Sequence, residues 1–201
     1  MLKKIAFVAI LLASAAFAQV SVGEHASFTF GTVWGEHTDD SYWGPGFTAG
    51  FDVKAPLDPK LSFVAGLEVD YRTITNEYKY RDTEIDHTYF FMYLRHPVVG
   101  RFYVDPKVFG EFGISAAVRL TSGNMAEGED EDGFDVFSGV YDSSEDMSRF
   151  EFGLIAGLGF AVTPKVDFNI RYAMALTNMA SHGNGGSKNM RFQAGLTYWF
   201  N

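Results

Sequence analysis

From residue 19 onwards, apolar residues alternate with polar or small residues in segments of about ten residues. The clearest segment ends the chain, where Phe192, Leu196 and Phe200 share one face and Arg191, Gln193 and Thr197 the other. Strict alternation is the period of a β-strand, whose side chains point to opposite faces in turn. Segments 149–162 and 166–177 repeat the pattern, so this part of the chain predicts three consecutive strands.

Earlier segments alternate in the same way, at 26–31, 47–54, 61–72 and 111–121, where Thr121 falls on the polar face. A further strand over about 88–104 is less regular, because Pro97 removes a ladder hydrogen bond and His96 falls on the apolar face. We expect a β-bulge there. The total is eight strands.

The connections between these segments fall into two classes. Pro59-Lys60, Pro106-Lys107 and Pro164-Lys165 each occupy a tight turn, whereas the other connections are long and polar. The long connections are predicted over 35–44, 75–86, 123–148 and 181–188. Short turns that alternate with long loops are typical of outer-membrane barrels, with the turns in the periplasm and the loops outside.

A soluble β-sandwich or lipocalin-type barrel shows the same alternation of apolar and polar residues. The composition of the polar face must therefore distinguish a soluble β-protein from a membrane barrel. Here that face carries many glycines and both charge signs, which suits a narrow lumen better than a solvated exterior. The interior of an eight-stranded barrel is just wide enough to be filled by side chains. An unpaired buried charge costs several kcal/mol, so we expect a paired charge network in the lumen. Its predicted members are Asp52, Glu68, Asp70, Arg72, Arg95, Arg101, Glu111, Arg119, Arg149, Glu151, Asp167, Arg171 and Arg191.

The first residues have the features of a secretory signal peptide. Lys3 and Lys4 precede an apolar run from Ile5 to Ala13, and Ala16-Phe17-Ala18 stands just before Gln19. A membrane-spanning helix would need about 20 apolar residues, more than this run contains. We therefore predict a cleaved signal peptide over 1–18 and one barrel domain over 19–201.

Charge and cysteine content narrow the function classes. Removal of Lys3 and Lys4 leaves 14 basic and 25 acidic residues, a net charge of −11, which argues against nucleic acid as a partner. The chain has no cysteine, so neither a disulfide framework nor a lipidated cysteine is available. The five histidines, His25, His37, His87, His96 and His182, do not recur at metal-ligand spacing. We expect no cofactor.

The longest predicted loop is strongly acidic. Nine acidic residues and no Lys or Arg lie between its ends: Glu127, Glu129, Asp130, Glu131, Asp132, Asp135, Asp142, Glu145 and Asp146. The simplest interpretation is a solvated, self-repelling loop, with a short hairpin around Ser138-Gly139. A calcium site is the alternative, although an EF-hand spacing would place Gly128 and Gly139 at ligand positions. The sequence leaves two candidate ligands for this loop, an extracellular partner and a divalent cation.

Several segments resemble the small bacterial outer-membrane β-barrel domain proteins, which are often labelled porin-family and are similar in architecture to OmpA- and OmpX-type barrels. They are 93–103 (YLRHPVVGRFY), Glu111-Phe112-Gly113, Arg171-Tyr172, Leu176-Thr177-Asn178 and 194–200 (AGLTYWF). The resemblance implies an all-β, eight-stranded antiparallel transmembrane barrel in the outer membrane, in contact with its lipid. It also implies recognition by the barrel-assembly machinery through a terminal aromatic residue, which Asn201 displaces by one position.

The favoured function is a structural or surface-interaction role for a monomeric, non-enzymatic barrel. A narrow diffusion pore is a second hypothesis, which an eight-stranded lumen disfavours. A lipid A-modifying enzyme is a third, because some barrels that this chain resembles are lipid A hydrolases with Ser and His residues. Ser181 and His182 would be the candidates here, but the sequence around them, SHGNGG, is typical of a flexible loop.

Overall fold

Nine antiparallel β-strands make up the described part of the chain, which comprises residues 20–34, 43–80, 83–129, 135–142, 148–179 and 186–200 of a computed structural model. Two of the predicted segments, the signal peptide over 1–18 and the Ser181-His182 pair, lie outside these residues. The strands are β1 (Ser21–Trp34), β2 (Trp43–Asp58), β3 (Leu61–Tyr80), β4 (Thr83–Tyr103), β5 (Val108–Glu129), β6 (Asp135–Asp142), β7 (Phe150–Thr163), β8 (Val166–Ala175) and β9 (Lys188–Trp199).

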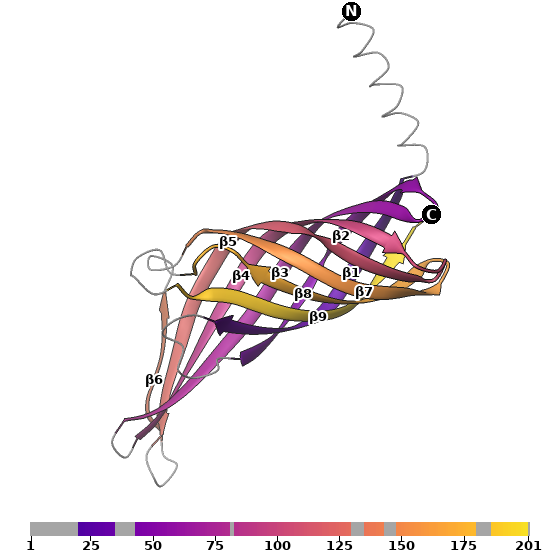
Figure 1. Cartoon of the computed structure of the whole chain (residues 1–201). Helices are drawn as coiled ribbons and strands as arrows, with labels where there is room; N and C mark the ends of the chain where they lie inside the picture. Colours follow the sequence, from indigo (N-terminus) through magenta and orange to yellow (C-terminus); the bar gives the residue numbers. More distant parts are fainter. Residues whose placement is uncertain are drawn as a thin grey trace, which may run out of the picture.

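Eight of the strands close into a barrel (Figure 1). Their order around it is β1, β2, β3, β4, β5, β7, β8 and β9, and β9 pairs with β1. The prediction of an eight-stranded antiparallel barrel is confirmed. None of the described residues belongs to a helix that is long and apolar enough to cross a membrane.

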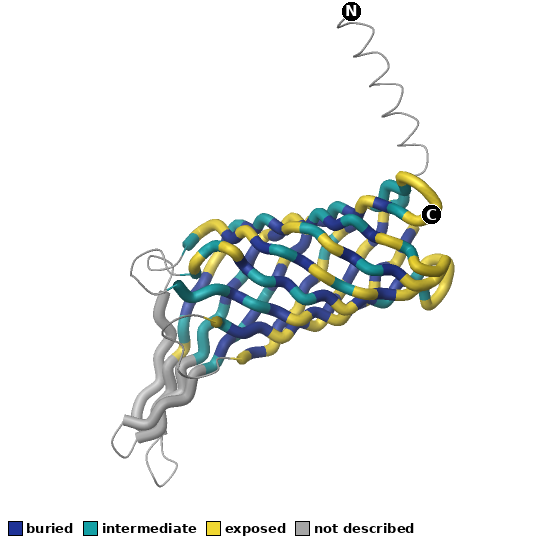
Figure 2. The backbone as a smooth tube through the Cα atoms, in the orientation of Figure 1, coloured by how far each residue is buried: buried dark blue, intermediate teal, exposed yellow. Residues whose placement is uncertain are grey.

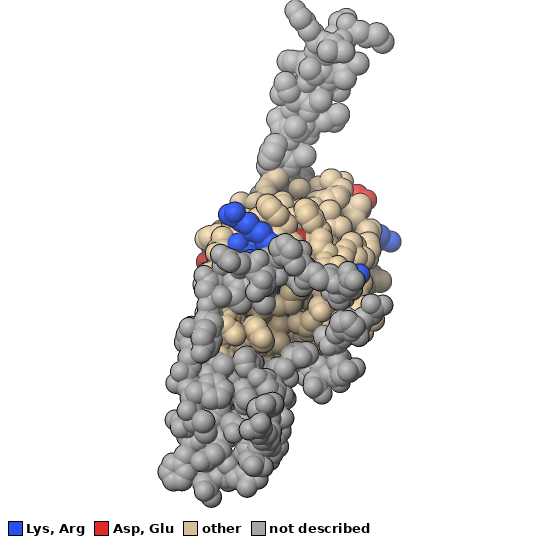
Figure 3. All heavy atoms as spheres, turned by 90° about the vertical axis from the view of Figure 1, so that its left-hand side faces the viewer, with Lys and Arg blue, Asp and Glu red and all other residues tan. Residues whose placement is uncertain are grey.

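The barrel wall is apolar outside and mainly polar inside, and Figure 2 shows the resulting alternation along each strand. In β9, Phe192 is 48% exposed and Leu196 52%, whereas Gln193 between them is 2% exposed. An exposed belt of large apolar side chains with a polar interior is the inverse of a soluble barrel. Seen from the end opposite the short turns, the described surface of the barrel is mostly uncharged (Figure 3).

Three strands continue past the barrel wall at the end opposite the short turns. The last residue of β3 that pairs with β2 is Thr75, and the last residue of β5 that pairs with β7 is Val118. Beyond these points β3 pairs only with β4 as far as Tyr80, and β5 pairs with β6 from Gly123. We call residues 76–80, 83–87, 123–129 and 135–142 the protruding sheet.

Two loop predictions are therefore wrong. Residues 75–86 are mostly strand, and much of 123–148 is also strand. The predicted hairpin within the acidic segment exists as β5 and β6, but Ser138 and Gly139 lie inside β6 and not at a turn. A strand outside the membrane contacts no hydrocarbon, so its sequence has no apolar face to distinguish it from a loop.

The bulge predicted in the fourth strand lies in the strand paired with it. Met92 pairs with Thr121 and Tyr93 with Arg119, so Leu120 of β5 is the extra residue. A bulge reverses the faces of the residues that follow it. Thr121 is consequently exposed and Ser122 is buried, contrary to the predicted lumen position of Thr121.

His96 compensates for Pro97 in the wall of the barrel. Ala65 pairs with Val98 and Glu68 with Arg95, so Gly66 of β3 stands opposite Pro97 of β4. Proline has no N–H to donate to the Gly66 carbonyl. The His96 ring Nδ1 instead lies 2.5 Å from that carbonyl oxygen and donates to it. Because hydrocarbon supplies no water to replace a lost hydrogen bond, this contact explains a histidine on the outer face.

Replacing His96 with Phe should lower the free energy of unfolding by about 1–3 kcal/mol, because the Gly66 carbonyl loses its donor. Equilibrium urea unfolding of the barrel in lipid vesicles measures this loss. The Pro97→Ala change supplies a backbone N–H opposite Gly66, so it should restore most of the stability in the double variant. A double variant no more stable than His96→Phe would contradict this role.

Candidate functional site

The lumen is the candidate site, because the charged side chains of the barrel are buried there. Twelve of the thirteen residues predicted for the charge network are buried, six carboxylates and six arginines. They are Asp52, Glu68, Asp70, Glu111, Glu151, Asp167, Arg72, Arg95, Arg101, Arg119, Arg171 and Arg191. Arg149, the thirteenth, is exposed, because it precedes the first residue of β7 and so stands at the rim.

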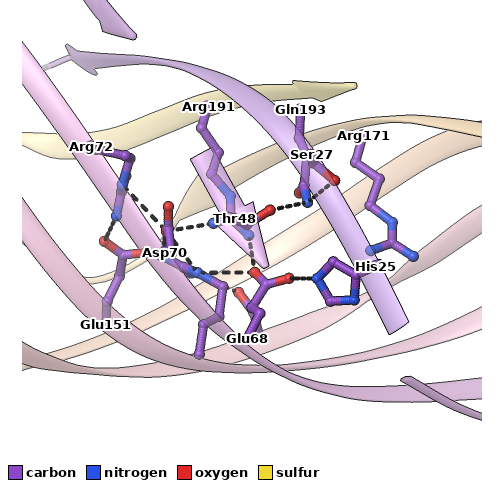
Figure 4. Close-up of polar contacts among 12 residues, drawn as sticks. His25, Ser27, Thr48, Glu68, Asp70, Arg72, Glu151, Arg171, Arg191 and Gln193 are labelled. Atoms are coloured by element: carbon purple, nitrogen blue, oxygen red, sulfur yellow. Dashed lines mark hydrogen bonds and ion pairs between the residues drawn. The ribbon is translucent and has the colours of Figure 1, made fainter. Parts of the chain in front are cut away.

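Asp70 lies at the centre of the larger of two clusters (Figure 4). Its Oδ2 accepts from Arg191 Nη1 at 2.5 Å and from Arg95 Nη2 at 3.0 Å. The Nε atom of Arg72 lies 3.3 Å from the same oxygen. One carboxylate, which is 0% exposed, therefore interacts with three guanidinium groups.

Two further carboxylates complete this cluster. Glu151 Oε1 accepts from Arg95 Nη2 at 2.8 Å, and Glu151 Oε2 accepts from the amide of Asn189 at 2.6 Å. Glu68 Oε1 accepts from Arg191 Nη2 at 3.0 Å. The contacts connect β3, β4, β7 and β9, so they tie opposite sides of the barrel together.

His25 is a lumen residue outside the predicted network. Its Nδ1 lies 3.1 Å from Asp52 Oδ2, and its Nε2 lies 3.1 Å from Glu68 Oε2. A carboxylate oxygen only accepts, so the Nε2–H of His25 donates to Glu68. The alternation predicted over 26–31, extended back by one residue, places His25 on the inner face.

The second cluster lies nearer the short turns. Glu111 Oε1 accepts from Arg101 Nη2 at 2.8 Å, and Glu111 Oε2 accepts from Arg171 Nε at 2.7 Å. Arg101 Nη1 also donates to Asp167 Oδ2 at 2.6 Å. This carboxylate oxygen accepts in addition from the Trp199 indole N–H at 2.8 Å.

Trp199 and Phe109 close the lumen at the short-turn end. Each is 1% exposed, and the guanidinium carbon of Arg101 lies 3.8 Å from the centre of the Phe109 ring. The Lys54 ammonium lies 4.1 Å from the centre of the Trp199 ring. Such cation–π contacts stabilise charged groups beside aromatic rings at the short-turn end of the lumen, which we call its floor.

The lumen is tightly packed around the larger cluster. Between Arg72, Arg95, Glu151 and Arg191, the gaps are too small to admit a water molecule. Small residues of β7 and β8 that line the same space, Gly153, Ala173 and Ala175, leave room for these long side chains. At this level of the barrel the described side chains leave no room for water, which fits a structural brace.

The nine predicted acidic-loop residues divide into two groups. Glu127 and Glu129 lie in the outer part of β5, and Asp135 and Asp142 are the end residues of β6. All four belong to the protruding sheet. The other five, Asp130, Glu131, Asp132, Glu145 and Asp146, lie outside the described residues.

Three solved structures resemble this one, each at low sequence identity. Ail, the attachment invasion locus protein of Yersinia pestis, has 11% sequence identity and a TM-score of 0.48, and the match covers 90% of this chain and 98% of that one. Neisserial surface protein A has 18% identity and a TM-score of 0.47, with coverages of 89% and 97%. CarO of Acinetobacter baumannii has 7% identity and a TM-score of 0.46, with coverages of 90% and 98%. No curated protein matches the sequence.

The family assignment rests on a family model that describes the outer membrane protein beta-barrel domain and matches residues 17–181. The match covers most of the chain, and the closed barrel with its apolar outer belt agrees with it. The resemblance noted in the sequence is thereby confirmed, as is the expected location. The chain belongs to the outer membrane protein β-barrel domain family, and it is a protein of the bacterial outer membrane.

Proposed function

We propose that the protein is a closed barrel with a structural and surface-interaction role, and that its contacts with partners are made through the protruding sheet. The observation that carries this proposal is the continuation of three barrel strands and β6 beyond the wall, at the end opposite the short turns. In outer-membrane barrels the short turns face the periplasm, so this sheet extends from the cell surface.

The register of the protruding sheet supports a positively charged partner. Glu77 lies directly opposite Asp86, and Asp86 lies opposite Glu127 on its other side. Two residues away, Glu84 lies opposite Glu129 on one side and opposite Lys79 on the other. Like charges at directly opposite positions destabilise a sheet. A cationic surface bound there would relieve that repulsion.

The packed lumen argues against the alternative of a narrow diffusion pore, because the space around Arg72, Arg95 and Arg191 admits no water molecule. The alternative of a lipid A-modifying enzyme depends on Ser181 and His182, which lie outside the described residues, so it stays a prediction. We further propose that the barrel is monomeric, lacks a cofactor and is inserted by the barrel-assembly machinery.

A charge-neutralised protruding sheet tests the proposal. The variant carries Asp86→Asn, Glu127→Gln, Glu129→Gln and Asp135→Asn, and Glu24→Gln, at the short-turn end, is the control. In nanodiscs, the wild type and the control should bind an immobilised oligolysine peptide, with an affinity that falls as salt rises. The fourfold variant should bind at least tenfold more weakly.

Equal binding of oligolysine by the wild type and the fourfold variant would contradict the proposed surface. A second measurement uses calcium alone. A bound divalent cation should protect the protruding sheet from protease in the wild type but not in the fourfold variant. Heat-modifiable migration on gels verifies that each variant forms the barrel.

A further inference from the structure

The three short turns share one design. In each, the backbone N–H of a lysine donates to a side-chain oxygen two residues earlier, with a proline between them. The acceptors are Asp58 Oδ1 for Lys60 at 2.6 Å, Asp105 Oδ1 for Lys107 at 3.0 Å and Thr163 Oγ1 for Lys165 at 3.2 Å. Proline and a side-chain cap fix the backbone, so each lysine is presented in the same way.

The three lysines are free to bind an external group. Each of them is exposed. Within the described residues, none of the three ammonium groups takes part in an ion pair. The carboxylates of Asp58 and Asp105 are instead occupied by the backbone of the turn.

An exposed apolar residue precedes each capped turn by one position. Leu57 is 56% exposed, Val104 84% and Val162 53%. Such side chains on an outer-membrane barrel lie against hydrocarbon, so each lysine, three residues further on, stands just past the hydrocarbon boundary. Phospholipid phosphates lie at this level, and a lysine side chain extends its ammonium towards them while its stem stays near apolar surface.

We propose that Lys60, Lys107 and Lys165 form a phosphate-binding collar for the phospholipids of the inner leaflet. The turns join β2 to β3, β4 to β5 and β7 to β8, so the collar lysines are distributed around the barrel. Neighbouring turns are at least two strand spacings apart, about 10 Å, which lets each lysine bind a separate headgroup. The collar sets the depth at which the barrel sits in the membrane.

The anionic cell-wall polymer is the competing partner for exposed lysines at this end. The apolar residues beside the turns favour the lipid, because Val104 would be left in water if the collar stood in the periplasm away from the headgroups. The collar and the protruding sheet occupy opposite ends of the barrel. Failure of one proposal therefore leaves the other unchanged.

Native mass spectrometry of the purified full-length barrel, titrated with phosphatidylglycerol, tests the collar. The triple variant K60Q/K107Q/K165Q should bind this lipid more weakly, by about fivefold for each lysine removed. The matched control K188Q removes a lysine at the other end and should bind as the wild type does. The triple lysine-to-arginine variant keeps the charges and should retain the lipid.

Equal lipid binding by the wild type and the triple glutamine variant would overturn the collar. An equal loss in K188Q would overturn it too, since the effect would then follow net charge and not position. A triple glutamine variant that keeps the lipid but loses soluble cell-wall fragments would assign the lysines to the cell wall, against the proposal.

Discussion

Replacing Asp70 with Asn is expected to lower the free energy of unfolding by about 3–5 kcal/mol, the cost of breaking a buried ion pair. The asparagine keeps the shape of the side chain but removes the one charge that Arg72, Arg95 and Arg191 share. The lumen then holds an excess positive charge in a place from which water is excluded. Equilibrium urea unfolding in lipid vesicles measures the loss.

Two further variants show whether the loss comes from the buried network. Glu24→Gln removes an exposed carboxylate and should change stability by less than about 0.5 kcal/mol. Adding Arg72→Gln to Asp70→Asn restores the charge balance, so the double variant should lose less than the sum of the single losses. Strictly additive losses would mean that Asp70 and Arg72 are not coupled.

Replacing Ile170 with Arg is expected to cost about 2–4 kcal/mol, because it places a charge in hydrocarbon near the bilayer midplane. Ile170 is 52% exposed on the outer face and lies in the middle of β8, Val166–Ala175. The same unfolding measurement applies. The matched change Val162→Arg, beside a short turn, should cost no more than about 1 kcal/mol because it lies at the membrane boundary.

Similar losses for Ile170→Arg and Val162→Arg would mean that the apolar belt is not centred on the hydrocarbon as the strand bounds imply. Stability unchanged by both substitutions would remove the evidence that this face contacts lipid at all.

The alternation of the sequence was sufficient to predict the barrel and the inward residues of its membrane-spanning part. It succeeds in β8 and β9 because one face meets lipid and the other a packed lumen, so each position has a clear polarity. The contacts between strands do not follow from alternation. That Asp70 and Arg191 meet, 121 residues apart in the chain, depends on how the barrel closes.

The failures have separate physical reasons. The sequence predicts a loop in place of the outer parts of β3 and β4, because no lipid imposes an apolar face on them. The extra residue Leu120 shifts the alternation of β5 by one position, and the residue types around it do not mark that shift. Metal-ligand spacing gives His25 no role, whereas the alternation of β1 points its side chain into the lumen, where it contacts Asp52 and Glu68.

Planar-bilayer recording of the purified, folded wild-type barrel tests the central claim, that the lumen is closed by paired charges, most directly. The six buried carboxylates, six buried arginines and the floor of Trp199 and Phe109 predict no stable open level above the baseline of the lipid. A large, stable single-channel conductance from the monomer would contradict the closed lumen and favour the diffusion pore.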